Sequence, residues 1–295
     1  MRTLAIAALL VSSIMLSATP AAWGWKADRP VGYVQLAEGQ VYAASPKGLR
    51  RLEALTPLLL GDLVAVSPGG KAQIIFHDGG VLVMGASSFA RVNEFEHAWG
   101  DASPKRNHMK AELGPGLFRY YGGGIQKKGP GGLRFKTPLG SLGPTGRSFG
   151  ARVASGDEAG AFEQTLNSVF QSLAALNLDD EKPKQPEQAA TLISLYEDSL
   201  QQRHFVQTHA HLKGFADQPM AFTDARGESH EVPPLKTLRV SESEARLLAE
   251  DNGFDLWSPL RIDPNAQTPG AYRIMLGEDW GVDSGSDASG SDCGC

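Results

Sequence analysis

The sequence predicts a mainly β fold, either a twisted β-sandwich or a short β-solenoid, with a helical hairpin inserted in it. Short segments between residues 31 and 153 alternate apolar and polar side chains, which is the period of a β-strand. The 34 glycines, 18 prolines and 8% aromatic content favour a turn-rich β protein over a helical bundle. Between residues 157 and 204, a helical period replaces the strand period.

Residues 71–84 are predicted to form a β-hairpin. Ala72, Ile74 and Phe76 share one face of the first strand, since alternate side chains of a strand point the same way. The pair Asp78-Gly79 is a strong turn signal, and an apolar strand resumes directly after it.

The helical hairpin insertion is placed at residues 154–204. Two apolar stripes at helical spacing flank a connector, residues 179–187, that contains two prolines. Each stripe must be buried against the other helix, the sheet or a partner. A stripe that packs against neither the other helix nor the sheet would form a binding face for a partner. The candidate residues of this partner face are Phe162, Leu166, Leu192 and Tyr196.

The C-terminal third is predicted to finish the β fold and then lose order. Residues 205–243 form a closing β segment, and residues 244–282 an arm that packs along the body. Ser241 and Glu244 match a capping box, which predicts a short helix ending near Gly253. Residues 283–295 contain glycine, serine and aspartate without apolar anchors, so a disordered tail is expected.

The N-terminal 24 residues predict a signal peptide. Arg2 precedes an apolar run, and small residues then allow cleavage after Ala22 or Gly24. The run is too short to span a bilayer, and we expect no transmembrane span in the mature chain. The protein is therefore expected to be periplasmic or otherwise exported.

Charge and cysteine content limit the possible functions. The net charge of −5, without a broad basic patch, argues against a nucleic-acid partner. Both cysteines lie within the last three residues, so the folded body contains no disulfide framework.

Several motifs together resemble the FecR domain, a periplasmic all-β module of envelope signalling in Gram-negative bacteria. They are Gly32-Tyr33-Val34, Gly39-Gln40-Val41, Leu60-Gly61-Asp62, residues 69–76, Asp78-Gly79-Gly80, residues 135–138 and residues 146–149. The resemblance covers residues 30–153. It implies a non-catalytic sensing or scaffolding module that contacts another envelope protein or a glycan.

The sequence also departs from the FecR pattern. An Arg-Gly-Thr tripeptide usual in the family is altered here, where the equivalent stretch is residues 142–149. The signalling members place a cytoplasmic region before a membrane span. No such region precedes the signal peptide here, so we expect a stand-alone exported member without direct anti-sigma activity.

No catalytic constellation and no cofactor motif is recognised, and two weaker site hypotheses remain. His209 and His211 share one face of a predicted strand and could offer two imidazoles to a metal, or they are ordinary surface histidines. Cys293 and Cys295 could bind a soft metal, form a disulfide or cross-link to another chain. The alternative functions are thus a surface protein tethered through its C-terminal Cys-Gly-Cys and a metal-binding protein.

Overall fold

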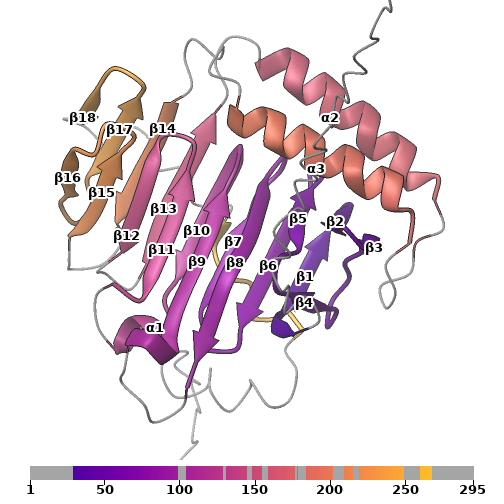
Figure 1. Ribbon diagram of the computed structural model, residues 1–295, viewed down its shortest axis with the longest axis horizontal. Coiled ribbons are helices and arrows are strands. Elements are labelled where there is room, and N and C mark those ends of the chain that lie inside the picture. The colour runs from indigo at the N-terminus through magenta and orange to yellow at the C-terminus, as the bar shows by residue number, and fades with distance from the viewer. Residues whose placement is uncertain are drawn as a thin grey trace, which may run out of the picture.

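The protein folds as a sandwich of two nine-stranded sheets, with two helices across one outer face (Figure 1). This computed structural model describes residues 29–98, 104–128, 131–144, 148–154, 159–176, 178, 184–201, 209–214, 219–248 and 260–267. The predicted mainly β class with a helical insertion is confirmed, as a sandwich.

We call the first sheet sheet A; all of its neighbouring strands are antiparallel. Its strand order is β18 (Ala245–Leu247), β17 (Thr237–Ser241), β14 (His209–Gly214), β13 (Ser148–Ala154), β10 (Gly116–Tyr121), β7 (Val81–Met84), β6 (Lys71–Phe76), β1 (Pro30–Glu38) and β4 (Pro57–Leu59).

Sheet B is antiparallel except where β11 pairs with β9. Its order is β16 (Ser229–Val232), β15 (Met220–Asp224), β12 (Gly140–Pro144), β11 (Leu133–Thr137), β9 (Asn107–Leu113), β8 (Phe89–His97), β5 (Leu63–Val66), β2 (Val41–Ser45) and β3 (Gly48–Arg51). The helical elements are the 3₁₀ turn η1 (Pro104–Arg106), the single turn α1 (Gly124–Lys127), α2 (Ala159–Ala174) and α3 (Pro186–Gln201).

The main core lies between the two sheets, where alternate residues of each strand point inward. The predicted hairpin is confirmed as β6 and β7, and Ala72, Ile74 and Phe76 all lie in this core. Tyr120 of sheet A packs against Phe135 of sheet B, with ring centroids 4.9 Å apart. Aromatic contacts of this kind hold the two layers together.

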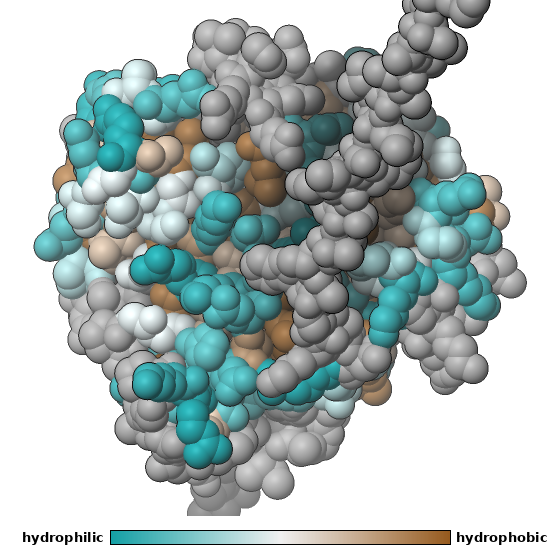
Figure 2. Space-filling view, in the orientation of Figure 1, coloured by the Kyte–Doolittle hydropathy of each residue, from teal (hydrophilic) through white to brown (hydrophobic). Residues whose placement is uncertain are grey.

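Helices α2 and α3 cover the outer face of sheet B at β2, β3 and β5 and at the start of β8. The rings of Tyr42 and Phe170 lie 5.6 Å apart, and those of Phe89 and Tyr196 lie 6.0 Å apart. Beside the helices, hydrophilic residues gather over the middle of this face (Figure 2). Both predicted apolar stripes are therefore used to bury one half of sheet B.

Residues 260–267 cover part of the outer face of sheet A. Leu260 is buried against Ile75, Val81 and Val83. The backbone N–H of Asp263 donates to the side-chain carbonyl of Gln73 over 2.9 Å, which satisfies this buried amide. The predicted packing of the C-terminal arm along the body is thus seen for this part of it.

The predicted short helix after Ser241 is wrong, because Ala245–Leu247 forms strand β18 against β17. The Ser241 hydroxyl accepts from the Glu244 N–H, as a helix cap would, but the Ser241 N–H donates to the Glu244 carbonyl. This pair of hydrogen bonds closes a β-turn. The same Ser-x-x-Glu pattern therefore forms the turn of a hairpin here, because the residues that follow it pair with the free edge of β17.

Membrane-spanning helices are not found in the described part of the chain, where no helix combines the necessary length and hydrophobicity. The predicted signal peptide lies outside the described residues.

A buried ion pair joins the two sheets at one edge. Arg50 of β3 and Asp62 form a 2.5 Å ion pair with only 3% and 4% of their side chains exposed. Arg50 also donates to the Pro57 carbonyl, and Asp62 accepts from the Leu59 N–H. Arg50 lies in β3 of sheet B, whereas Pro57 and Leu59 lie in β4 of sheet A. The ion pair and its hydrogen bonds therefore connect the edge strands of the two sheets. Burial raises the pKa of Asp62, and the Arg50 guanidinium offsets part of that rise.

Breaking this pair from one side should strongly destabilise the fold. We expect Asp62→Asn or Arg50→Met to lower the free energy of unfolding by about 3–5 kcal/mol, because each leaves a buried group without its partner. The double variant Arg50→Met/Asp62→Leu should recover most of this loss. Urea denaturation of the three variants measures the effect. Single variants as stable as the parent would contradict this account.

Candidate functional site

The most distinctive surface of the molecule is a line of basic side chains on the outer face of sheet A. Arg152 of β13 is the register partner of His211, His211 that of Arg239, and Arg239 that of Arg246. We call these four residues the basic row. It crosses β13, β14, β17 and β18, and spans roughly 14 Å at the usual spacing of strands.

The alternation of each strand exposes this row. Arg152 lies between the buried residues Ala151 and Val153, and Arg239 lies between Leu238 and Val240. The apolar neighbours point into the core, so the arginines must point outward. Arg239 and Arg246 are exposed, and Arg152 is half-buried.

Other cations lie beneath and beside the row. Lys213 of β14 has 1% of its surface exposed, and Arg119 of β10 is half-buried with its guanidinium over the Tyr121 ring. Burial lowers the pKa of Lys213, and the charge of Arg119 lowers it further. Burial also lowers the pKa of Arg119, with a further contribution from Arg261. Further cations are therefore grouped around the basic row on this half of sheet A.

The outer face of sheet B shows the opposite arrangement. Glu94 and Lys110 are register partners and form a 2.9 Å ion pair. Glu112 and Lys136 are also register partners, 3.7 Å apart. Opposite charges placed across strands stabilise a sheet, whereas like charges destabilise it. Among the described residues, no ion pair involves the three arginines of the row.

A cleft opens at the Arg152 end of the row. It has a volume of about 330 Å³ and lies where β13, the start of β10 and the first turn of α2 meet. Ser87 donates a hydrogen bond of 2.8 Å to Glu163 at its wall. Its lining thus combines a guanidinium, a carboxylate and a hydroxyl with apolar surface from Pro115, Leu117 and Phe162.

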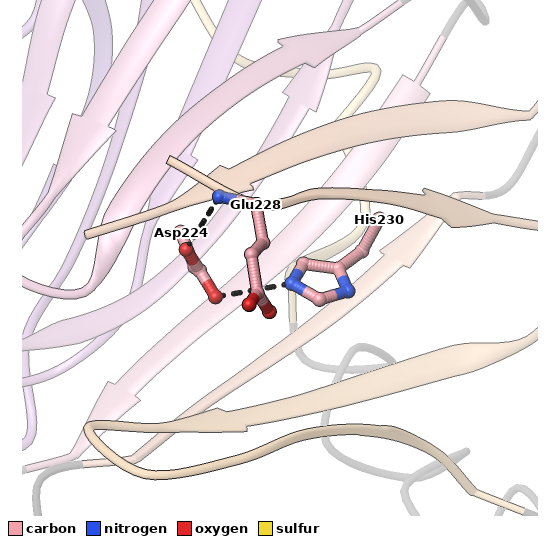
Figure 3. A group of neighbouring side chains, drawn as sticks. All are labelled: Asp224, Glu228 and His230. Carbon is pink, nitrogen blue, oxygen red and sulfur yellow. Dashed lines mark hydrogen bonds and ion pairs between the residues drawn. The ribbon is translucent and has the colours of Figure 1, made fainter. Parts of the chain in front are cut away.

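A second polar cluster joins Asp224, Glu228 and His230 on the β15–β16 hairpin (Figure 3). Asp224 Oδ2 is 2.7 Å from Arg226 Nη2 and 3.1 Å from His230 Nε2, and its Oδ1 accepts the N–H groups of residues 226 and 228. The Arg226 guanidinium thus occupies the place of a cation. Its hydrogen bond lowers the pKa of Asp224. We therefore interpret the cluster as a turn-stabilising device.

The predicted partner face on the helical hairpin is not exposed. Leu166, Leu192 and Tyr196 have no exposed surface, and Phe162 is only partly exposed. All four pack against sheet B, because its outer face would otherwise leave apolar residues in water. A partner could reach the first three only by displacing the helices, so this assignment is corrected.

The predicted metal and thiol residues are not assembled in the described structure. His211 lies in the basic row, between two arginines that would repel a metal cation. The side chain of His209, and both Cys293 and Cys295, lie outside the described residues, so their predicted roles stay predictions.

Sequence reasoning missed the basic row. Each arginine stands between apolar residues in its own segment, which signals an outward position. Their adjacency, however, depends on the strand order β13-β14-β17-β18, in which helices α2 and α3 separate the first two strands along the chain. No local motif encodes that order.

Comparison with known proteins identifies no family. No family model matches the chain, and no curated protein matches it. Two crystal structures of a "putative anti-sigma factor" from Parabacteroides distasonis are similar over 63% of this chain, with 11% identity and TM-scores of 0.34 and 0.33. The match spans 57% of those chains, less than two thirds. At this level of similarity the comparison supports no conclusion about function, and the FecR resemblance rests on the sequence motifs.

The like-charge row should reduce stability. We expect Arg239→Gln to raise the free energy of unfolding by about 0.2–1 kcal/mol, because it relieves repulsion from Arg246, its register partner on β18. The matched change Lys110→Gln on sheet B should lower it, since it breaks a favourable pair. Urea denaturation at low salt compares the two. A loss of stability in Arg239→Gln would contradict the assignment.

Asp224 should make the fold acid-sensitive. Its pKa is lower in the folded state, so its contribution is complete above the ordinary aspartate pKa of about 4 and is lost as the pH falls through the folded value. Asp224→Asn should lower the melting temperature at pH 7 and flatten its decline below pH 4. An unchanged acid profile would show that the turn does not depend on this carboxylate.

Proposed function

We propose that the protein is an exported, non-catalytic binding module of the cell envelope, and that its partner docks on the basic row. The observation that carries the proposal is the alignment of Arg152, Arg239 and Arg246 on one sheet face. Cross-strand repulsion makes this arrangement unfavourable for the isolated fold. An anionic partner places its negative charges next to the guanidinium groups. The resulting attraction offsets the repulsion between the arginines.

The absence of an assembled active site in the described residues supports a non-catalytic role. The cleft beside the row contains Ser87 and Glu163, but no histidine or cysteine lines it. Hydrolytic serine sites need a base that accepts the hydroxyl proton, usually an imidazole. Asp62 and Asp78, the described carboxyl groups with a raised pKa, are both buried inside the fold and accept hydrogen bonds there.

The proposed location rests on the sequence. Residues 1–24 have the organisation of a signal peptide, and the motifs of residues 30–153 resemble a periplasmic module. A partner protein or glycan of the envelope is then accessible to the outer face of sheet A. The helical hairpin covers one half of the outer face of sheet B and does not reach the basic row on sheet A.

A crosslinking pull-down from intact cells tests this function. We compare the parent with Arg152→Gln/Arg239→Gln/Arg246→Gln and with the matched triple variant Lys110→Gln/Arg134→Gln/Lys136→Gln, which removes three cations from sheet B. The parent and the sheet B variant should capture the same envelope component, and the row variant should not. Capture should also weaken as salt screens the charges. Equal capture by all three proteins would refute the proposed face.

A further inference from the structure

We infer that the partner of the basic row is a linear acidic polysaccharide, one sugar of which enters the cleft at Arg152. This inference rests on the proposed function, since it assumes that the row is the binding face. It adds the chemical class of the ligand and the position of its most specific contact.

The shape of the exposed charge favours a linear ligand. Arg239 and Arg246 are exposed, whereas Lys213 in the adjacent position of β14 is buried. Arg152, Arg239 and Arg246 therefore lie in a single file across the strands, with two strand spacings between the first two and one between the last two. A flexible polyanion can place one acidic group against each of them. A planar membrane surface would use a broad basic patch instead.

The cleft at the end of the file has the chemistry of an acidic sugar site. The Arg152 guanidinium matches a carboxylate, for which arginine is the preferred bidentate partner. Glu163 and Ser87 can accept and donate hydrogen bonds to ring hydroxyls. Phe162 and Leu117 offer apolar surface to the face of a ring.

Other polyanions match these contacts less well. An acidic peptide such as polyglutamate would satisfy the arginines, but its side chains carry no hydroxyl group to donate to the Glu163 carboxylate in the cleft. A single-stranded nucleic acid binds through successive stacking aromatic rings. None of the four positions of the row is phenylalanine, tyrosine or tryptophan. Glu163 therefore favours a ligand that carries hydroxyl groups next to its acid groups, which is the composition of a uronic-acid polymer.

Isothermal titration with defined probes tests this inference on the mature protein. The probes are hexagalacturonate, neutral maltohexaose, hexaglutamate and vesicles that contain phosphatidylglycerol. Hexagalacturonate should bind at least about tenfold more tightly than hexaglutamate or the vesicles, and maltohexaose should not bind measurably. Arg152→Gln should weaken hexagalacturonate binding by about tenfold, the scale of one lost charge-assisted contact.

Two further variants separate the cleft from the row. Glu163→Ala removes a charge that repels both anions and an acceptor that only sugar hydroxyls use, so it should lower the ratio of hexagalacturonate affinity to hexaglutamate affinity several-fold. Lys136→Gln on sheet B should change neither. Melting curves confirm that each variant is folded.

The possible outcomes distinguish the two proposals. Hexaglutamate or vesicles that bind as tightly as hexagalacturonate, with the row variants still defective, would overturn the sugar assignment and keep the binding face. Hexagalacturonate binding that survives loss of the three row arginines would overturn both. No binding of any anionic probe would also overturn both.

Discussion

The structure depends on how the outer faces of its two sheets are covered. A sandwich buries only the inner faces, and each outer face must be polar or carry another layer. Helices α2 and α3 cover sheet B around Tyr42 and Phe89, and residues 260–267 cover sheet A around Ile75. The remaining half of sheet A, from β13 to β18, is where the basic row lies. The outer face of sheet A thus has a covered part around Ile75 and a charged part along the basic row.

The helical hairpin is a structural layer over one half of sheet B. Its apolar stripes complete a second core, so little of them remains for a partner. The arginines of the basic row make no ion pair with the described acidic side chains, whereas Glu94 and Lys110 on sheet B form one. Natural proteins often retain an unfavourable arrangement where binding requires it.

The sequence predicts local features well and non-local ones poorly. The β6–β7 hairpin and the two helices follow from periodicity and turn residues within one segment. The turn at Ser241 was misjudged because a capping pattern and a hairpin turn use the same hydrogen bond, and only the free edge of β17 decides between them. The basic row could not be predicted, because only the strand order brings Arg152 and Arg239 to either side of His211. The cleft could not be predicted for the same reason, because Ser87 and Glu163 are 76 residues apart in the sequence.

Arginine footprinting in the native envelope tests the central claim most directly. Phenylglyoxal modifies accessible guanidinium groups, and mass spectrometry reports the extent at each site. The account predicts that Arg239 and Arg246 are protected in intact cells relative to the purified protein, while Arg134, exposed on sheet B, reacts equally in both. Equal reactivity of all three arginines in both states would show that nothing covers the basic row, and would contradict its role as the binding surface.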